Sequence, residues 1–417
     1  MRQFQLALAL LFAAVLAGCG GDDSSSGSPV TKIKFTSQVS FGDSLSDVGS
    51  YAVGTIQALH GGKYTVNSLT PSAQNWTELM AAQLGLAAPC PAQTGLNGAA
   101  ASGFSVPVVN HAGCTGYAQG GARVTNPSGI GSATLDPALG GSTVLGSLTV
   151  PVVTQIQNHL AAVGGKFSGT EIVFVMAGAN DVLVQLATLN AGATAAGTAA
   201  VTAAVPARMQ SDIAAGLCTP TTPQLTNCIN QAVAELTPTV GAAAGNAYAA
   251  NAGGQAAVLA MAQAGTELVG YINNLLLAKG AKYVTVLNIP DIGSTPFGVA
   301  LGATTVALVD SMVATFNQQL QAGLAGNPNV LLVDADAQLH SYVQAPGQYG
   351  LSNVAAPACN LAPSVNILGS SLVCTTSSVI AGDVSHYLFA DSVHPTPYGN
   401  SLVANFVAAQ LSARGWM

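Results

Sequence analysis

Short apolar runs along the chain alternate with segments in which apolar residues recur at helical spacing. Residues 33–41 and 171–176 are rich in β-branched and aromatic residues, which is typical of buried strands. Trp76, Leu79, Met80 and Leu84 recur instead at the spacing of one helix face. The same criteria predict strands at 283–289 and 330–333 and helices at 75–84, 152–163, 255–277, 305–324 and 396–411. Apolar strands that alternate with helices indicate an α/β fold with a parallel sheet covered on both faces.

Four further segments depart from this alternation. Residues 89–114 and 206–239 are long, rich in Pro, Gly and Thr, and each contains two cysteines. We expect them to be insertions without a core of their own, on a single domain that spans residues 31–417. Residues 182–206 and 236–266 are almost uncharged, but Ala, Gly, Thr and Asn outnumber large aliphatic residues in them. They therefore favour packed Ala-rich helices over membrane spans, which need about 20 predominantly apolar residues.

The N-terminus has the layout of an export signal. Met1-Arg2 precedes an apolar run at residues 6–16, which ends in Leu16-Ala17-Gly18-Cys19. This tetrapeptide resembles the bacterial lipoprotein box, in which the cysteine becomes the lipidated first residue after cleavage. We expect a signal peptide at 1–18 and a lipidated Cys19 with a flexible Gly/Asp/Ser tether at 19–30. The alternative is an ordinary signal with a chance cysteine, so the protein is predicted to be an outer-membrane or surface lipoprotein, or secreted.

Six cysteines remain in the exported chain once Cys19 is set aside. An even number in an oxidising compartment indicates disulfides, although six cysteines allow 15 pairings. They fall into three neighbouring couples, which makes the pairing of neighbours the simplest hypothesis: Cys90 with Cys114, Cys218 with Cys228, and Cys359 with Cys374. The chain has no Cys-x-x-Cys or His-x-x-x-His spacing, so we expect no zinc site.

Charge excludes one class of partner. The 417 residues include only 10 Lys and Arg, with a formal net charge of −7, which argues against binding to nucleic acid. Nothing in the sequence indicates the oligomeric state.

Four short segments, far apart in the chain, carry groups suited to nucleophilic catalysis. Ser44 follows the first predicted strand directly, so its hydroxyl should lie at the carboxyl edge of the sheet, where open α/β sheets bind ligands. A serine needs a base, and His394 has an aspartate, Asp391, three residues before it to orient its ring. The segments 117–122 and 178–181 offer donors for an oxyanion: a backbone N–H in Gly120-Gly121 and the side-chain amide of Asn180.

Each segment alone has an ordinary structural explanation. Gly-Asp-Ser-Leu is a common turn, and Asp391 could simply cap the helix that follows it. The second Asp-x-x-His copy, Asp383 and His386, shows how easily that spacing arises, and we interpret His386 as a packed or surface residue. Asp47 and Asp181 are expected to anchor turns and loops. The occurrence of all four segments in this order, each at a strand end or loop, favours catalysis.

Over residues 32–414 the chain resembles the GDSL hydrolases of the SGNH superfamily. The matching blocks are residues 41–47 (FGDSLSD), 117–123 (YAQGGAR), 178–181 (GAND) and 391–395 (DSVHP), with weaker likeness at 287–291 and at 147–160 around Gln155. The resemblance implies a flavodoxin-like three-layer α/β/α sandwich and ester hydrolysis without metal or cofactor. It makes Ser44 the nucleophile and His394 and Asp391 its partners. The oxyanion donors become the N–H groups of Ser44 and Gly121 and the amide of Asn180, although Gly116 replaces a family Asn and leaves Gly120 as an alternative.

The leading hypothesis is a secreted or surface-anchored serine esterase or lipase that acts on a small-molecule or lipid ester. A carbohydrate esterase that deacylates polysaccharides is the alternative within the enzyme class. A non-catalytic surface lipoprotein is a third hypothesis, but a binding module has no use for Ser44, Asn180, Asp391 and His394 together. The α/β-hydrolase fold is disfavoured because we find no Gly-x-Ser-x-Gly elbow.

Overall fold

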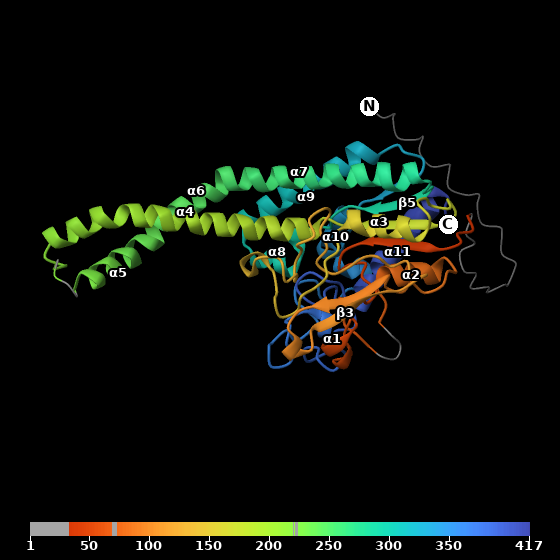
Figure 1. Ribbon diagram of the computed structural model, residues 1–417, viewed down its shortest axis with the longest axis horizontal. Helices are drawn as coiled ribbons and strands as arrows, with labels where there is room; N and C mark the ends of the chain where they lie inside the picture. The colour runs from red at the N-terminus through yellow and green to blue at the C-terminus, as the bar shows by residue number, and fades with distance from the viewer. Residues whose placement is uncertain (1–32, 69–72, 220, 222–223) are drawn as a thin grey trace, which may run out of the picture. The chain divides into compact units, whose positions relative to one another are not determined.

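Four parallel strands form the centre of the domain, in the order β1-β4-β5-β6 (Figure 1). They are β1 (Gln38–Gly42), β4 (Ile172–Met176), β5 (Tyr283–Leu287) and β6 (Val330–Val333). All four predicted strands are present in this computed structural model, although the first begins five residues later than expected. In the register of the sheet, Gly42 pairs with Met176, Met176 with Leu287, and Leu287 with Val333. The carboxyl ends of the strands are therefore level, and the segments that follow them meet along one edge.

Helices cover both faces of the sheet, because side chains alternate along each strand. Val173 and Val175 point into one apolar layer, while Phe174 and Met176 point into the other. The first layer is built with α3 (Val152–Ala162), α4 (Ala179–Ala214), α7 (Gly254–Tyr271) and α9 (Ala303–Leu324). The second layer is built with α2 (Trp76–Gln83) and α11 (Pro397–Arg414). The predicted three-layer α/β/α sandwich is confirmed, and all five predicted helices are present.

Capping residues explain where the two helices of the second layer, α2 and α11, begin. Asn75 accepts the N–H groups of Thr77 and Glu78, and the Glu78 carboxylate accepts the N–H of Asn75, which forms a capping box at the start of α2. Thr396 caps α11 by accepting the N–H of Gly399 at 3.0 Å. Asp391 therefore does not cap the last helix, and its carboxylate is available for another role.

The segment 206–239, predicted only as an insertion, is mostly helical. Helix α4 continues through Pro206 to Ala214, and α5 (Gln224–Leu236) runs back along it. High Ala content favours the helix over the break that a single proline introduces. Arg208 joins the two helices, since it bonds Asp212 on α4 at 3.0 Å and also pairs with Glu235 on α5. The chain then continues through α6 (Ala242–Tyr248) and turns of π-helix into α7.

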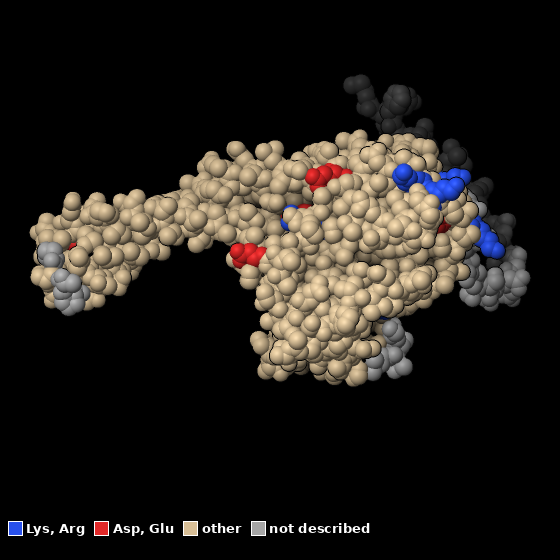
Figure 2. Space-filling view, viewed as in Figure 1, with Lys and Arg blue, Asp and Glu red and all other residues tan. Residues whose placement is uncertain are grey.

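These helices form an arm that extends beyond the sheet (Figure 1). Figure 2 shows that charged side chains are few on this face of the arm. The hydroxyls of Thr194, Thr198 and Thr202 each donate to the carbonyl four residues earlier, so these polar groups are satisfied within the helix. The uncharged segments are thus packed helices, as expected. Among the helices of the described chain, none is both long and apolar enough to cross a bilayer.

The three cysteine couples pair as predicted. Cys90 bonds Cys114 at the base of a hairpin formed by β2 (Gln93–Asn97) and β3 (Ser105–Asn110), which makes up most of the 89–114 insertion. Cys218 bonds Cys228 between α4 and α5, and Cys359 bonds Cys374 in the loops before α11. Three disulfides are typical of an exported protein.

The remaining helices are short and lie around the carboxyl edge of the sheet or in its loops: α1 (Gly54–Ala58), α8 (Pro296–Ala300) and α10 (Ala335–Gln344). The structure describes residues 33–68, 73–219, 221 and 224–417. The predicted signal peptide, Cys19 and the tether lie outside these residues, which form a single unit.

Candidate active site

Ser44 lies in the turn that follows β1, at the carboxyl edge of the sheet, as predicted. Gly42 allows the chain to leave the strand there, because its φ is +150° and a Cβ at this position would meet the Met176 carbonyl oxygen at 2.1 Å. The buried Gln155 side chain of α3 accepts the Gly42 N–H and donates to the Gly42 carbonyl, both at 2.8 Å. The turn itself closes by a bond from the Ser46 N–H to the Asp43 carbonyl. Gln155 and Gly42 therefore fix the base of the Ser44 turn.

His394 connects Ser44 to Asp391. Its Nε2 lies 2.8 Å from Ser44 Oγ, and its Nδ1 lies 2.8 Å from Asp391 Oδ2. The three side chains come from the two ends of the chain, 350 residues apart, yet form one continuous series of hydrogen bonds. The loop that carries Asp391 and His394 is tight, because the Ala390 N–H donates to the His394 carbonyl at 2.7 Å.

The Asp391 carboxylate is buried and fully hydrogen-bonded. Its Oδ1 accepts the N–H groups of Val393 and His394, and its Oδ2 accepts the N–H of Ser371 at 2.9 Å. Burial alone would raise its pKa, but the nearby His394 and these donors together hold the pKa of Asp391 well below its usual value. Asp391 is thus an anion near neutral pH, positioned to hold the Nδ1–H tautomer of His394. The other Asp-x-x-His copy is exposed, and His386 contacts Tyr398 and Ser385 rather than the site.

Gly120 and Gly121 differ in whether their N–H is free. The Gly120 N–H donates to Asp47 Oδ2 at 2.9 Å, so it is already used. The Gly121 N–H has no acceptor among the described residues, and Gly121 lines the same cavity as Ser44. Its φ is +78°, and a Cβ would meet the Ile130 carbonyl oxygen at 2.0 Å, so the position requires glycine. The geometry favours Gly121 as the donor.

Asn180 lies in the first turn of α4 and is 5% exposed. Its Nδ2 donates to the Ala122 carbonyl at 3.0 Å, which orients the amide group. An amide nitrogen carries two hydrogens, so the second remains available to a ligand. Ser44, Gly121 and Asn180 all line one cavity, with His394 and Asp391.

Two further aspartates hold these loops in place, as the sequence predicted. Asp47 accepts the N–H groups of Gly49, Ser50 and Gly120, which connects the Ser44 turn to the glycine segment. Asp181 accepts Arg123 Nε at 2.9 Å and the Val124 N–H at 3.0 Å, which connects that segment to α4. Asp43, beside the nucleophile, is 1% exposed, and burial raises its pKa to about 7.

Sequence reasoning missed two residues of the site. The Tyr64 ring lies against His394, with 4.8 Å between ring centroids, and Tyr64 also lines the cavity. Ser371 supplies the backbone N–H that binds Asp391 Oδ2. Neither residue belongs to a recognisable motif, and a backbone donor leaves no trace in residue type, so no signal pointed to them.

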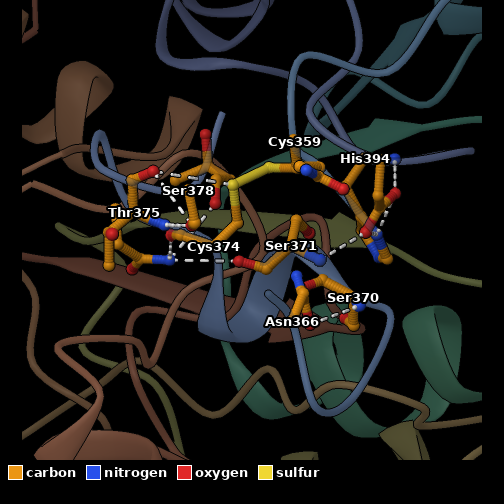
Figure 3. The surroundings of a disulfide bond; sticks show 12 residues. Cys359, Asn366, Ser370, Ser371, Cys374, Thr375, Ser378 and His394 are labelled. Carbon is orange, nitrogen blue, oxygen red and sulfur yellow. Dashed lines mark hydrogen bonds and ion pairs between the residues drawn. A yellow bond between two sulfur atoms is a disulfide. The ribbon is translucent and has the colours of Figure 1, made fainter. Parts of the chain in front are cut away.

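Ser371 is itself held next to a disulfide (Figure 3). It lies three residues before Cys374, whose partner Cys359 donates its N–H to the Ala390 carbonyl at 2.9 Å. Asn67 Nδ2 donates to the carbonyls of both Ser371 and Cys374. The Cys359–Cys374 bridge thus joins the segment that supports Asp391 to a segment that is hydrogen-bonded to Ala390. Among the described residues no three His, Cys, Asp or Glu side chains cluster in a way that could hold a metal ion.

Comparison with known proteins gives an independent result. A family model described as GDSL-like lipase/acylhydrolase matches residues 245–407, the part of the chain that contains Asp391 and His394. A GDSL esterase/lipase of Arabidopsis thaliana is 29% identical over 164 residues, which cover 35% of this chain and 44% of that protein. Esterase EstA of Pseudomonas aeruginosa is 31% identical over 142 residues, covering 32% of this chain and 20% of that protein.

The chain spans less than half the length of these curated relatives. The family model nevertheless includes the block at 391–395, and the α/β sandwich places Ser44 and Asn180 at strand ends beside it. The resemblance drawn from the sequence is confirmed: the C-terminal part of the chain is similar to the GDSL-like lipases and acylhydrolases.

Proposed function

We propose that this protein is an exported serine esterase that cleaves carboxylic esters with Ser44, His394 and Asp391. The observation that carries the proposal is the unbroken hydrogen-bond series from Ser44 Oγ through His394 to Asp391, which opens into a cavity. Similarity to GDSL-like lipases and esterases supports a carboxylic-ester substrate. The cavity lining is mainly apolar, which favours a lipid or other acyl ester over an acetylated polysaccharide.

The reaction follows from the positions of the groups. Ser44 Oγ attacks the ester carbonyl carbon while its proton passes to His394 Nε2, and Asp391 stabilises the imidazolium that forms. The carbonyl oxygen becomes an oxyanion, which accepts hydrogen bonds from the N–H groups of Ser44 and Gly121 and from Asn180 Nδ2. His394 then gives its proton to the departing alkoxide, which leaves as the alcohol. Water attacks the acyl-enzyme in the same way, with its proton on His394, and releases the acid and free Ser44.

The non-catalytic alternative is countered by the way in which the donors are prepared. A binding module would not need a glycine with a positive φ whose N–H is unused beside an amide oriented by Ala122. Such fixed donors stabilise charge that develops in a transition state, because they need no reorganisation when it forms.

The first prediction concerns the nucleophile. Ser44→Ala should fold normally and lose on the order of 10⁴-fold or more in kcat, because no other group replaces the hydroxyl. A fluorophosphonate probe should label the wild-type protein at Ser44, as peptide mass spectrometry would show. Ser385→Ala, at an exposed serine outside the site, is the matched control and should keep full activity. Labelling elsewhere, or an active Ser44→Ala protein, would exclude this mechanism.

The second prediction separates transition-state stabilisation from substrate binding. Asn180→Ala should lower kcat by roughly 10²–10³ with little change in KM, because the second N–H of the amide acts on the oxyanion. Steady-state kinetics on one soluble ester is sufficient. A change confined to KM would assign Asn180 to substrate binding instead.

The third prediction concerns the bridge beside Ser371. We propose that Cys359–Cys374 keeps the Asp391 loop in place, since its loop of 15 residues gains about 3 kcal/mol on the chain-entropy model. The double variant Cys359→Ser/Cys374→Ser should remain folded at 25 °C but lose about tenfold in kcat/KM and be cut by proteases near this loop. The matched double variant at Cys218 and Cys228, on the arm, should keep wild-type kcat/KM. Equal losses in both double variants would show that the bridges act on the whole domain.

The fourth prediction concerns attachment. We propose that Cys19, outside the described residues, carries lipid and tethers the enzyme to a membrane by its N-terminal segment. Wild-type protein should partition into detergent, whereas Cys19→Ser should be released in soluble form. Mass spectrometry that finds a mature N-terminus beyond Cys19 in the wild-type protein would rule out the anchor.

A further inference from the structure

The cavity at Ser44 continues past the catalytic groups along the carboxyl edge of the sheet. Its volume is about 370 Å³, and its lining extends from Ser44, after β1, to Ala335, after β6. Between them it passes Met176 and Leu287, the last residues of β4 and β5, with Val403 and Phe406 of α11 also in its wall. We call the part of the cavity that is lined by Met176, Leu287, Ala335, Val403 and Phe406 the tail pocket.

The five residues that line the tail pocket are all apolar. Met176 is 5% exposed and Leu287 1% exposed, so the wall of the pocket is part of the packed layer beneath α11. The carboxylate and the imidazole in the cavity lining are those of Asp391 and His394, which lie at the catalytic end. Tyr342, which also lines the cavity, already donates its hydroxyl to the Leu402 carbonyl at 3.0 Å. The cavity lining also includes Gln338 of α10 and Trp76, whose buried Nε1 has no partner among the described residues. A ligand in the tail pocket would therefore find mostly apolar contacts.

We propose that the tail pocket binds the acyl chain of a medium-chain ester, with about eight to ten carbons, and that Ala335 sets the length limit. The inference rests on the proposed esterase function, because it needs an ester carbonyl at Ser44. The occupant is argued from continuity: one cavity joins Ser44, Gly121 and Asn180 to the tail pocket.

Two measures of size agree. Three strand spacings separate β1 from β6, which is about 14 Å, and an extended chain advances roughly 1.2 Å per bond, so about twelve bonds fit. A methylene is about as large as a water molecule, which takes about 30 Å³ in the liquid, so 370 Å³ holds on the order of twelve such groups. The ester group and the start of the alcohol occupy part of that space, which leaves about eight to ten carbons for the chain.

The acyl side fits this pocket better than the alcohol side. A glycerol or sugar alcohol has hydroxyls, which cost free energy when they are buried without partners. An acyl chain has none, and each buried methylene favours binding. The alcohol is left with the other part of the cavity, where Ser147 and Ser370 lie in the lining.

Ala335 is the residue best placed to limit the chain. It begins α10 directly after β6, at the far end of the strand order from Ser44, and it is 9% exposed. A larger side chain there would fill the end of the tail pocket and leave the catalytic groups unchanged. Ala337, on the same helix, is exposed and outside the cavity lining, which makes it a matched control position.

The first experiment measures kcat/KM for p-nitrophenyl esters from acetate to palmitate. Wild-type kcat/KM should rise by up to about fourfold per methylene to an optimum near eight to ten carbons, then level off or fall. Ala335→Phe should move the optimum to four to six carbons and leave kcat/KM for acetate within about twofold. Ala337→Phe should match the wild type. A flat series, an optimum at sixteen carbons, or the same shift in both variants would overturn the proposal. If the Ala335→Phe protein does not fold, Ala335→Leu provides the test, with a smaller expected shift of the optimal chain length.

A pair of isomers tests which side of the ester enters the pocket. Ethyl octanoate and octyl acetate have the same composition and differ only in where the long chain lies. Wild type should prefer ethyl octanoate by at least tenfold, and Ala335→Phe should remove that preference. A preference for octyl acetate that Ala335→Phe removes would place the alcohol in the tail pocket and overturn the acyl assignment.

A binding measurement separates the tail pocket from catalysis. The chain has two tryptophans, and Trp76 lines the cavity, so Ser44→Ala/Trp416→Phe leaves Trp76 as the single fluorophore. Octanoate with bromine on its terminal carbon should quench Trp76 fluorescence saturably. Ala335→Phe should weaken the affinity for this ligand by at least tenfold, whereas Ala337→Phe should leave the affinity unchanged. If the ligand quenches Trp76 but Ser44 of the wild-type protein does not react with fluorophosphonate, the tail pocket is supported and the esterase function is rejected. If the wild-type protein hydrolyses esters but quenching is not saturable, the esterase function is supported and the tail pocket is rejected.

Discussion

Buried backbone N–H groups must find acceptors, and the loops at the carboxyl edge of this sheet have no ladder or helix to supply them. Buried aspartates fulfil this requirement. Asp47, Asp181 and Asp391 are each at most 4% exposed, and each accepts at least one backbone N–H from a segment distant in the sequence. In a chain with only 17 acidic residues, this is a concentrated use of charge. The positions of the proposed catalytic groups depend on these carboxylates because they join the loops to one another.

The sheet aligns the ends of its strands, and the buried carboxylates connect the loops that follow them. Level strand ends bring the Ser44 turn beside the start of α4, and Asp47 and Asp181 then bind the glycine segment from both sides. The same pattern decides between two neighbouring glycines. Asp47 accepts the Gly120 N–H, whereas the N–H of Gly121, which lines the cavity, has no acceptor among the described residues. A structural hydrogen bond at one residue thus leaves its neighbour free for chemistry.

The sequence was informative where periodicity and residue type carry the signal. All four strands of the parallel sheet and five helices were predicted, because apolar side chains must meet one another in the two layers beside it. The proximity of Ser44 and Asn180 followed from their places after strands, and the base that a nucleophilic serine needs pointed to His394 and Asp391. The helical course of segment 206–239 was not predicted, because its Pro, Gly and Thr content gave no helical signal, yet the Ala-rich helix continues through Pro206 and Arg208 ties it to α5. Ser371 and Tyr64 were not predictable, because their contacts depend on how loops fold back.

Asn180 lies in the first turn of the 36-residue helix α4, whose length has a consequence for the electrostatics of the site. The N-terminus of a helix carries a partial positive charge, equivalent to roughly half a proton, which favours a negative oxygen placed before it. That field arises mainly from the unpaired N–H groups of the first turn, so the distal turns of α4 add little to it. The part of α4 that lies beside α5 therefore contributes little to the electrostatic potential at the proposed oxyanion. Substitutions in those distal turns should leave the electrostatic potential at Asn180 nearly unchanged, whereas substitutions in the first turn should alter it.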